Sequence, residues 1–339
     1  MTMTPYLLNM LCDPEDQSRL SIKHPRYDEN GNITAGILES KNGNTYPVRH
    51  GIPRFTGERA RVRTSVSHAE QHSDFHQNLY RESWLNEYVK ETFTTPNAFI
   101  GKNVIDCGGG TGYQSKWMIE HGAKHVIVLE NSHHVDGVAR ECMEECECID
   151  IVQCSLEALP FRKNGFSGLI TCNDVLQHTE SFDNSLKSLW DILNDNGEIV
   201  ISCPVRQSQY WYQKMRYKAV NQGLRNFLST RSVYLAEMYS RVAAFLYLIP
   251  LCGYILRKNN LVHRSTKPGG YFCLRRRYKD AFHRTFEYFA GHKYEHMKTP
   301  IELKQLINHL QRNPCYVLNT ETFFQKDRPL GVAIRLKKK

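Results

Sequence analysis

The sequence contains no apolar run long enough to cross a lipid bilayer and no sign of a secretory leader. Its most apolar stretch, residues 242–256, is interrupted by Pro250 and Gly253, whereas a membrane-spanning helix needs about 20 consecutive apolar residues. Residues 1–10 carry no Lys or Arg and end in no small-residue cleavage site, the features that mark a signal peptide. We therefore expect a protein located in the cytoplasm.

Cysteines with a recognisable pairing are also missing. The chain has 11 cysteines, an odd number without the spacing of a disulfide framework, which is typical of free thiols in a reducing compartment. Cys142, Cys146 and Cys148 are close enough in sequence to suggest a metal, but no second pair of matching spacing accompanies them. Structural zinc sites draw their ligands from two such groups, so we expect no bound metal.

Acidic residues are in deficit. The chain has 35 Asp and Glu against 44 Lys and Arg, a formal net charge of +9, which fits an anionic partner or a membrane surface. We favour a plainer source, namely the basic residues 337–339 and scattered surface side chains, and expect no nucleic-acid partner. Hydrophobic residues make up 41% of the 339, enough for a sizeable core in one large domain with additions or in two domains.

Strand-like and helix-like stretches alternate through the middle of the chain. Short apolar runs typical of buried strands end at Ile105 and cover residues 125–129, 149–154, 168–173 and 198–202. Helical patterns cover residues 113–121, 132–145 and 182–193. The alternation stops at residue 205 and resumes with a helix over 299–310 and strands over 315–322 and 330–336. This order predicts an α/β fold with a doubly wound, mostly parallel sheet of seven strands.

A glycine-rich turn follows the first of these strands. Residues 106–112 are Asp-Cys-Gly-Gly-Gly-Thr-Gly, and glycines let the backbone approach a ligand without a Cβ in the way. Dinucleotide-binding folds use a similar turn, so the glycines alone do not identify the ligand. Three further features follow in order: Glu130 at the end of the second strand, Ser-Leu-Glu-Ala-Leu-Pro-Phe at residues 155–161, and Asn-Asp-Val-Leu-Gln-His at residues 173–178.

This ordered set, over residues 100–204, resembles the class I S-adenosylmethionine-dependent methyltransferases, in particular the methyltransferase-domain group. The resemblance implies a Rossmann-like fold with S-adenosylmethionine as cofactor. It implies that Asp106, Gly108 and Gly110 border the methionine and ribose parts of the cofactor, and that Glu130 binds the ribose hydroxyls. A dehydrogenase would also use the glycine turn, but it has no use for the two later segments.

The same resemblance assigns residues after the third and fourth strands. It implies that Asn173 faces the methionine end of the cofactor. Ser155 stands where the family usually has a carboxylate that touches the adenine amino group. A serine hydroxyl still accepts a hydrogen bond, so we expect adenine recognition to be weaker or to shift to the Leu156 backbone.

His178 is the candidate catalytic residue. It lies just beyond the fourth strand, at the rim where a substrate enters, and a histidine there can act as general base for a hydroxyl nucleophile. The alternative is a packed or hydrogen-bonded histidine without a catalytic role. We favour this second interpretation and leave the first to experiment.

Residues 1–56 are expected to form a small β-rich module, and residues 57–98 a linker with short helices. Residues 7–11, 20 and 46–53 resemble the zinc-ribbon-like prefix of many bacterial methyltransferases. In the alignment that this implies, Asp13 and Asp16 replace the first cysteine pair, and Glu39 and Asn42 replace the second. Zinc ribbons need thiolate or imidazole ligands, so we expect a metal-free module that keeps its fold by packing.

Residues 205–296 interrupt the core, and residues 297–339 complete it. The insertion is rich in aromatic and basic residues. We favour a helical cap whose apolar faces are buried over the substrate pocket; the alternative is a helix at a membrane interface, flanked by Arg241, Arg257 and Lys258. By analogy with a motif that follows long insertions in the same family, the candidate substrate residues are Tyr288, His292 and Tyr294.

The function that these features favour is a methyltransferase. The expected acceptor is a hydroxyl, amine or carboxyl group of a small or medium-sized metabolite, such as a sugar or an amphipathic intermediate. The aromatic residues of the insertion favour an apolar or ring-bearing acceptor. Two alternatives remain: a methyltransferase acting on RNA or protein, which the positive charge would suit, and a scaffold that binds S-adenosylmethionine without catalysis. The oligomeric state is left open.

Overall fold

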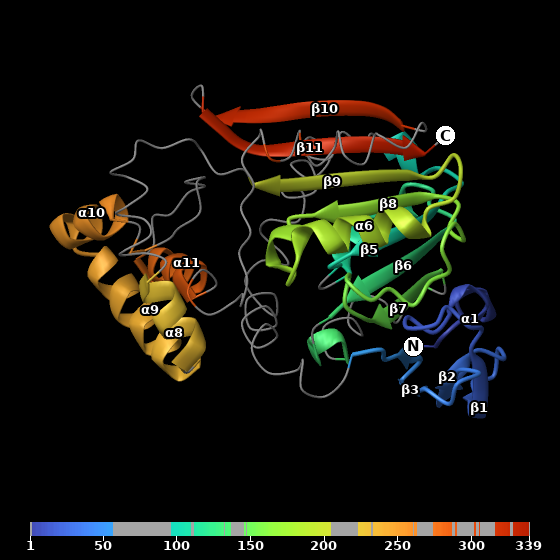
Figure 1. Ribbon diagram of the computed structural model, residues 1–339. Helices are drawn as coiled ribbons and strands as arrows, with labels where there is room; N and C mark the ends of the chain where they lie inside the picture. Colours follow the sequence, from blue (N-terminus) through green and yellow to red (C-terminus); the bar gives the residue numbers. More distant parts are fainter. Residues whose placement is uncertain are drawn as a thin grey trace. The chain divides into compact units, whose positions relative to one another are not determined.

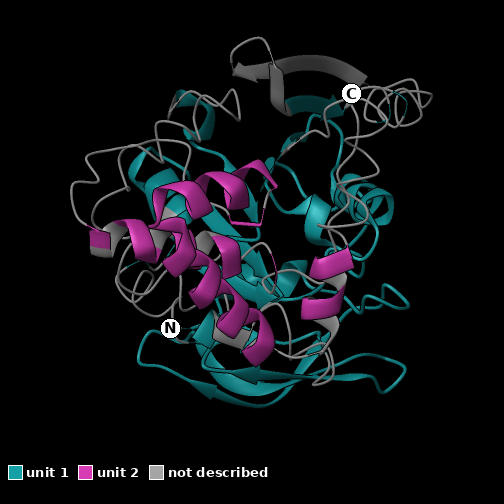
Figure 2. Cartoon of the chain, turned by 90° about the vertical axis from the view of Figure 1, so that its left-hand side faces the viewer, with its two compact units in different colours: residues 1–60, 77–207, 294–339 teal, residues 61–76, 208–293 magenta. Residues whose placement is uncertain are grey.

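The chain, in this computed structural model, forms two compact units (Figure 2). One unit comprises residues 1–60, 77–207 and 294–339, and the other residues 61–76 and 208–293. Within them the structure describes residues 2–56, 96–109, 112–131, 133–136, 146, 148–204, 223–231, 233–259, 261–262, 274–286, 289, 302, 305, 316–325 and 328–338.

The first unit contains a seven-stranded sheet of order β10-β11-β9-β8-β5-β6-β7 (Figure 1). The bounds are β5 (Asn103–Cys107), β6 (His125–Glu130), β7 (Ile149–Gln153), β8 (Leu169–Asn173), β9 (Glu198–Pro204), β10 (Tyr316–Gln325) and β11 (Arg328–Lys338). Strands β5 to β9 pair in parallel, whereas β11 lies antiparallel between β9 and β10. The expected doubly wound, mostly parallel seven-stranded sheet is confirmed.

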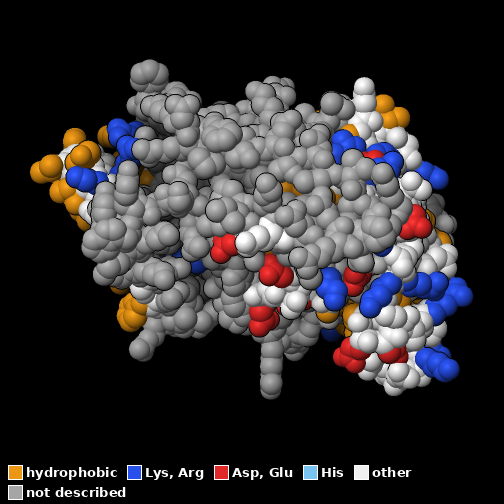
Figure 3. Space-filling model, turned by 45° about the horizontal axis from the view of Figure 1, so that its top comes forward, with side chains coloured by type: hydrophobic (Ala, Val, Ile, Leu, Met, Phe, Trp, Pro, Cys, Tyr) orange, Lys and Arg blue, Asp and Glu red, His pale blue; other side chains and the backbone are white. Residues whose placement is uncertain are grey.

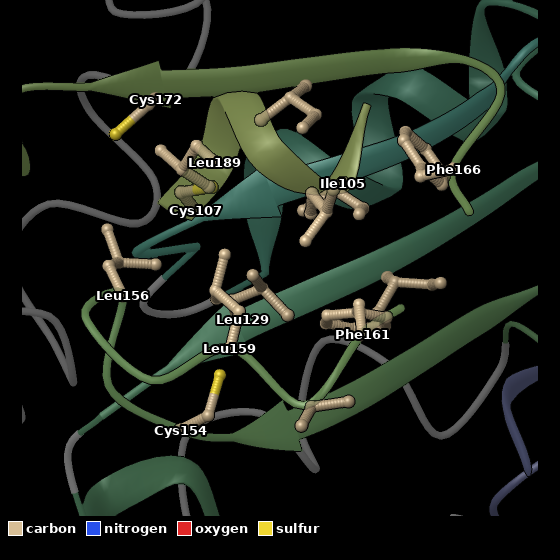
Figure 4. Packing of buried hydrophobic residues seen from close by; sticks show 14 of the residues in the cluster. Ile105, Cys107, Leu129, Cys154, Leu156, Leu159, Phe161, Phe166, Cys172 and Leu189 are labelled. Atoms are coloured by element: carbon tan, nitrogen blue, oxygen red, sulfur yellow. The ribbon is translucent and has the colours of Figure 1, made fainter. Parts of the chain in front are cut away.

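The two faces of the sheet carry separate hydrophobic clusters, because alternate side chains of a strand point to opposite faces. One cluster includes Ile105, Ile127 and Ile170, and it also contains Leu186 and Leu189 of helix α6 (Phe182–Ile192). Figure 4 shows residues of this cluster beneath α6. The other cluster includes Val104, Val126, Val128 and Leu169, with Trp117 and Met118 of helix α4 (Tyr113–Glu120). Both faces are therefore covered, as the continuous apolar strands require.

Helix α6 forms where its sequence predicts. Ser181 caps its N-terminus by accepting a hydrogen bond from the Asn184 N–H, and Asp183 lies in its first turn. Its C-terminal carbonyls are bonded by the chain's end: the Lys338 Nζ donates to the Leu193 carbonyl at 2.6 Å. The expected helix over residues 182–193 is thus found within one residue.

Three other predicted segments are only partly covered by the residues that the structure describes. Of the helix expected over residues 132–145, the structure describes a 3-10 turn, η3 (His133–Asp136). Of the helix expected over residues 299–310, it describes Glu302 and Gln305, both helical. Of residues 57–98 it describes the first three residues of the 3-10 turn η2 (Pro96–Phe99).

Strand order reverses between β5 and β8. From β5 the chain proceeds outward to β6 and β7 on one side and then returns to β8 and β9 on the other. In open α/β sheets a ligand binds beyond the carboxyl ends of the strands at such a reversal. This topology therefore places the candidate site at the ends of β5, β6, β7 and β8.

The N-terminal module is a helix and a four-stranded antiparallel sheet. Its elements are α1 (Pro5–Met10), β1 (Ser21–Tyr27), β2 (Ile33–Glu39), β3 (Thr45–Arg49) and β4 (Ile52–Pro53), paired in that order. The expected turn at residues 28–32 is built on Asp28, whose Oδ1 accepts from the N–H groups of Asn30 and Asn32. In Figure 3 basic and acidic side chains are mixed on the exposed side of this module.

The module and the large sheet share one core. Leu7, Leu11, Leu38 and Val48 of the module belong to the same buried cluster as Ile105 and its neighbours. Backbone bonds continue the contact, since the Cys12 N–H donates to the Pro160 carbonyl at 2.9 Å and the Phe55 N–H to the Gln153 carbonyl at 2.8 Å. The N-terminal residues are therefore built onto the edge of the sheet at β7.

The four positions aligned with zinc ligands carry polar side chains of a different kind. Asn42 donates to the carboxylate of Asp16, and the neighbouring Asn44 Nδ2 donates to the buried Asp13 Oδ2 at 3.0 Å. Amide-to-carboxylate bonds thus join the loop after α1 to the turn between β2 and β3. Among the described residues no cluster of His, Cys, Asp or Glu is arranged to hold a metal ion, and the relation of this module to zinc ribbons stays a prediction.

The second unit is helical in its described parts. It contains α8 (Gly223–Arg231), α9 (Val233–Tyr247), α10 (Pro250–Lys258) and α11 (Leu274–Phe286). Ala243 and Ala244 of α9 pack in one cluster with Ala281, Phe282 and Phe286 of α11. In the part of the chain that the structure describes, no helix has the length and apolarity needed to span a membrane.

The expected burial of the apolar faces in residues 242–256 is only half correct. Ala243, Ala244 and Tyr247 are buried, but Val242, Phe245 and Tyr254 are exposed. The physical reason is that small side chains of α9 face α11 closely, which leaves the large apolar side chains on the opposite face of the helix.

Candidate functional site

The glycine turn after β5 is shaped by close packing beneath it. Gly108 has φ +67°, and a Cβ placed on it would lie 2.4 Å from Cγ2 of Val175. Its N–H donates to the carbonyl of Leu129, the next-to-last residue of β6, at 2.7 Å. Glycine is thus required here both by backbone conformation and by the side chain of the loop after β8. Gly110 lies outside the described residues, so its predicted role stays a prediction.

Asp106 is a fully buried carboxylate one residue before the end of β5. It accepts hydrogen bonds from the Ser115 Oγ at 2.7 Å and from the Thr171 Oγ1 at 3.2 Å. Burial raises the pKa of Asp106 to about 6; the two hydroxyl groups lower it, and the nearby charge of Glu130 raises it further. The site therefore contains a carboxylate whose ionised form is disfavoured in the ligand-free protein.

Glu130 and Asn173 lie on either side of the glycine turn. Cys107 is in register with Leu129 of β6 and with Cys172 of β8, so the next residue on each strand, Glu130 and Asn173, flanks Gly108. Both side chains are half-buried. Gly108, Glu130 and Asn173, all predicted site residues, therefore lie together where the strand order reverses, because the carboxyl ends of parallel strands share one edge of the sheet.

The loop after β8 is held in a specific conformation. Ser202 donates a side-chain hydrogen bond to the Asn173 Oδ1, and the Asp174 N–H donates to the Ser202 carbonyl at 3.0 Å. Asp174 has φ +54°, the left-handed region that few residues other than Gly, Asn and Asp adopt. This backbone arrangement aims residues 174–178 back over the glycine turn, where Val175 contacts it.

Ser155 is already engaged in a turn. Its Oγ accepts from the Glu157 N–H at 3.3 Å, and the Glu157 Oε1 accepts from the Ser181 N–H at 2.6 Å. The carboxylate nearest to Ser155 in sequence is therefore directed at the N-terminus of α6. Leu156, between them, is buried.

His178 ends the short 3-10 turn η4 (Leu176–His178) and is half-buried. Its Nε2 lies 3.3 Å from the side-chain Nε2 of Gln177. Gln177 itself is buried, and within the described structure its Oε1 has no hydrogen-bond partner. A buried acceptor without a donor beside the candidate site is a place for a ligand N–H or O–H, and sequence reasoning did not single out this residue.

Arg54 is a second residue that the sequence did not reveal. It comes from the end of the N-terminal module and is buried, yet its Nη1 donates to the Gln153 Oε1 at 2.8 Å and its Nη2 to the Asp136 Oδ1 at 2.5 Å. It thus joins the end of β7 to the loop after β6, next to Glu130. Nothing in the local sequence around Arg54 marks it, because both partners are about 80 to 100 positions away.

The predicted substrate residues Tyr288, His292 and Tyr294 lie outside the described residues. Their roles stay predictions.

Residues 105–201, which carry Asp106, Gly108, Glu130, Asn173 and His178, match the family described as "Methyltransferase domain". This part of the chain is therefore similar to a methyltransferase domain. The cofactor of this domain is S-adenosylmethionine. The side chains at the ends of β5, β6 and β8 fit this cofactor. Their carboxylates and amide can bond the hydroxyl and amino groups of a nucleoside and an amino acid.

Curated relatives match this methyltransferase domain at low identity. The ubiquinone biosynthesis O-methyltransferase of Erwinia tasmaniensis is 28% identical over 135 residues, 40% of this chain and 52% of the relative. The ubiquinone/menaquinone biosynthesis C-methyltransferase of Francisella tularensis is 29% identical over 120 residues, 34% of this chain and 47% of the relative. The chain thus spans about half the length of these relatives.

A solved S-adenosylmethionine-dependent methyltransferase from Mesorhizobium loti is also similar. It has 14% sequence identity and a TM-score of 0.41, covering 71% of this chain and 93% of that chain.

Proposed function

We propose that the protein is an S-adenosylmethionine-dependent methyltransferase that acts on a hydroxyl, amine or carboxyl group of a small or medium-sized metabolite. The observation that carries the proposal is the convergence of Asp106, Glu130 and Asn173 at the strand-order reversal of a methyltransferase domain. The names of the relatives refer to ubiquinone and menaquinone biosynthesis. They support a small acceptor, and the aromatic insertion favours one that carries an apolar ring.

The residues of this chain position the cofactor. When bound, the cofactor supplies a methyl group on a sulfonium cation, which is transferred to a nucleophile in line. Glu130 would accept hydrogen bonds from the ribose hydroxyls, and Asp106 and Asn173 would border the methionine part. The positive charge of the sulfonium region favours the ionised form of the nearby Asp106. Much of the rate then comes from holding the nucleophile near the methyl group.

His178 is the candidate general base for a hydroxyl or amine acceptor. A neutral imidazole accepts one proton from the nucleophile as the new bond to the methyl group forms. The Gln177 amide N–H donates to the Nε2 lone pair of the ring at 3.3 Å, so this contact has to open before Nε2 can accept the proton of the nucleophile. A carboxyl acceptor is already ionised at neutral pH and has no need of this base.

Cofactor binding is the first test. Isothermal titration with S-adenosylhomocysteine should give a dissociation constant that Glu130→Ala and Asp106→Ala each weaken by at least about tenfold, since each removes hydrogen bonds to charged groups. The matched control is Glu157→Ala, whose carboxylate bonds the Ser181 N–H instead; it should bind as the wild type does. Unchanged affinity in both site variants would remove the proposal.

Acceptor class is the second test. Labelled methyl groups from S-adenosylmethionine should enter a low-molecular-weight cell extract and leave total RNA and protein unlabelled. Labelling of RNA, with binding that weakens steeply as salt rises, would favour the macromolecular alternative. Cofactor binding without transfer to any fraction would favour the non-catalytic scaffold.

The role of His178 is tested separately. His178→Ala should lower turnover by about a hundredfold, the usual contribution of a positioned base, without changing the affinity for S-adenosylhomocysteine. Turnover equal to the wild type would assign His178 to packing.

A further inference from the structure

Helix α9 exposes several of its large apolar side chains, whereas a helix of a soluble bundle normally buries such side chains against its neighbours. The buried face carries small residues, Ala236, Ala243 and Ala244, which pack with α11. The exposed face carries Tyr234, Met238, Val242 and Phe245, of which Tyr234 is 71% and Phe245 62% exposed. At 100° per residue these four positions share a stripe roughly 80° wide. Such a stripe marks a surface that is covered by something else.

Helix α10 extends this apolar surface. Leu251, Tyr254 and Ile255 share one side of the helix, and Leu251 is 71% and Tyr254 64% exposed. Ile249, also exposed, lies in the turn between α9 and α10. The tight junction is made by Gly253, where a Cβ would lie 2.3 Å from the Tyr247 carbonyl oxygen. The two helices therefore form one connected element with apolar side chains on the outside.

The charge of this unit is strongly positive. Ten Lys or Arg and two Asp or Glu lie on α8, α9, α10 and α11, so these four helices carry a net +8 of the chain's +9. One of the two acids, Glu237, is bonded to Arg241 at 2.6 Å. Arg257 and Lys258 end α10 beside its exposed apolar side chains. At the left of Figure 3, where α10 is drawn, basic side chains lie next to hydrophobic ones.

We propose that α9 and α10 dock the protein onto the surface of an anionic lipid bilayer. In the residues that the structure describes, neither helix is long enough to cross a membrane, so both would lie in the plane of the interface with their apolar side chains among the acyl chains. Arg257 and Lys258 at the end of α10 would meet the acidic headgroups, whereas Arg241 is bonded to Glu237.

A bilayer fits this surface better than RNA does. Sequence-independent RNA binding uses aromatic side chains on which bases stack, whereas Met238, Val242, Leu251 and Ile255 are aliphatic. A lipid interface accepts aliphatic and aromatic side chains together, and a lining of basic residues is typical of it. Helices α8 to α11 carry a net +8 of the chain's +9, so the excess charge does not come only from residues 337–339 and scattered surface side chains.

Vesicle sedimentation tests the proposal with the full-length chain. The wild type should pellet with vesicles of phosphatidylcholine containing about a third phosphatidylserine and much less with phosphatidylcholine alone. The variant Phe245→Ser with Leu251→Ser should lower the partition coefficient by at least about tenfold, because it removes two exposed side chains of several CH₂ equivalents each. Arg257→Glu with Lys258→Glu should abolish the preference for the acidic lipid.

The control is a matched pair of exposed apolar residues in the other unit. Tyr27 and Ile100 are 58% and 62% exposed, and Tyr27→Ser with Ile100→Ser should leave vesicle binding unchanged. Thermal melting and S-adenosylhomocysteine titration on the same preparations show that each variant is folded, and separate a failure of this proposal from a failure of the proposed function.

Three outcomes would overturn the proposal. The wild type stays in the supernatant with both kinds of vesicle; or the apolar variant pellets like the wild type; or light scattering shows a dimer that the apolar variant dissociates while vesicles bind neither form. Binding to RNA that depends on Arg257 and Lys258 but not on Phe245 and Leu251, in the absence of vesicle binding, would likewise assign the surface to a nucleic acid.

Discussion

Replacing Asp106 by Asn should stabilise the cofactor-free protein at neutral pH while weakening its affinity for the cofactor. The carboxylate is fully buried at the end of β5, and its burial is the main reason that its pKa rises from 3.8 to about 6. Asn is close to Asp in shape and carries no charge. Its amide can keep both neighbours, because the Ser115 and Thr171 hydroxyl groups donate as well as accept.

The magnitude follows from the size of the pKa shift. A rise of about two units corresponds to about 3 kcal/mol of free energy by which the folded state disfavours the ionised form. Because the folded-state pKa is above the unfolded value, the folded state binds more protons between pH 4 and 6, so stability falls as pH rises through that window. Above about pH 6 the full penalty is present, and Asp106→Asn removes it.

Thermal melting of the cofactor-free protein between pH 5 and 8 measures this. At pH 8 Asp106→Asn should melt a few degrees above the wild type, since 1 kcal/mol is worth about 1–2 °C in a chain of 339 residues, and the difference should shrink toward pH 5. Excess S-adenosylhomocysteine should raise the melting temperature of the wild type more than that of the variant.

The control is Asp150→Asn, at a carboxylate that is equally buried but belongs to no predicted site. Asp150 accepts from the Thr4 N–H at 2.9 Å, and its Oδ2 lies 2.7 Å from the Nε2 of His125. The Asn side chain can still accept from the Thr4 N–H, but it offers no carboxylate oxygen to His125 at the Oδ2 position, so the melting temperature should fall. If Asp106→Asn also melts lower at pH 8, or if its difference from the wild type does not depend on pH, then desolvation does not dominate at Asp106.

Three further predictions concern the turn and the contacts around it. Gly108→Ala should weaken S-adenosylhomocysteine binding in titration by at least about tenfold, because φ is +67° and the new Cβ would meet Val175; Val175→Ala in the same chain should recover part of the loss, and no recovery would mean that the backbone strain alone is responsible. Arg54→Met should lower the free energy of unfolding in urea by about 2 kcal/mol, because it removes two charge-assisted hydrogen bonds. A loss of under about 0.5 kcal/mol would show that these hydrogen bonds do not stabilise the fold. Burial raises the pKa of Glu198, but the hydrogen bond and charge of Arg335 outweigh it, so the pKa is lowered. The wild type should therefore be more stable to urea than Glu198→Gln at pH 7, and this difference should disappear as the pH falls below about 4. A difference that persists at pH 3 would contradict a stabilising ion pair.

The order of strands and the place of the cofactor site were accessible to sequence reasoning. Buried parallel strands are short apolar runs, so β6 and β8 were found within one residue of their bounds. The glycine turn and Glu130 follow their strands directly, and parallel strands bring their ends together without any further information. These features depend on neighbours in sequence and on a topology rule, which is why they could be predicted.

Tertiary contacts decided the rest. Ser115 and Thr171 surround Asp106, and Arg54 joins β7 to the loop after β6, from positions that are far from their partners along the chain. Similarly, periodicity shows that α9 is apolar on more than one side but does not say which side faces α11. The close approach of the two helices selects Ala243 and Ala244 for the interior. Burial and long-range pairing are properties of the packed chain, and a sequence pattern is equally compatible with either face of the helix turned inward.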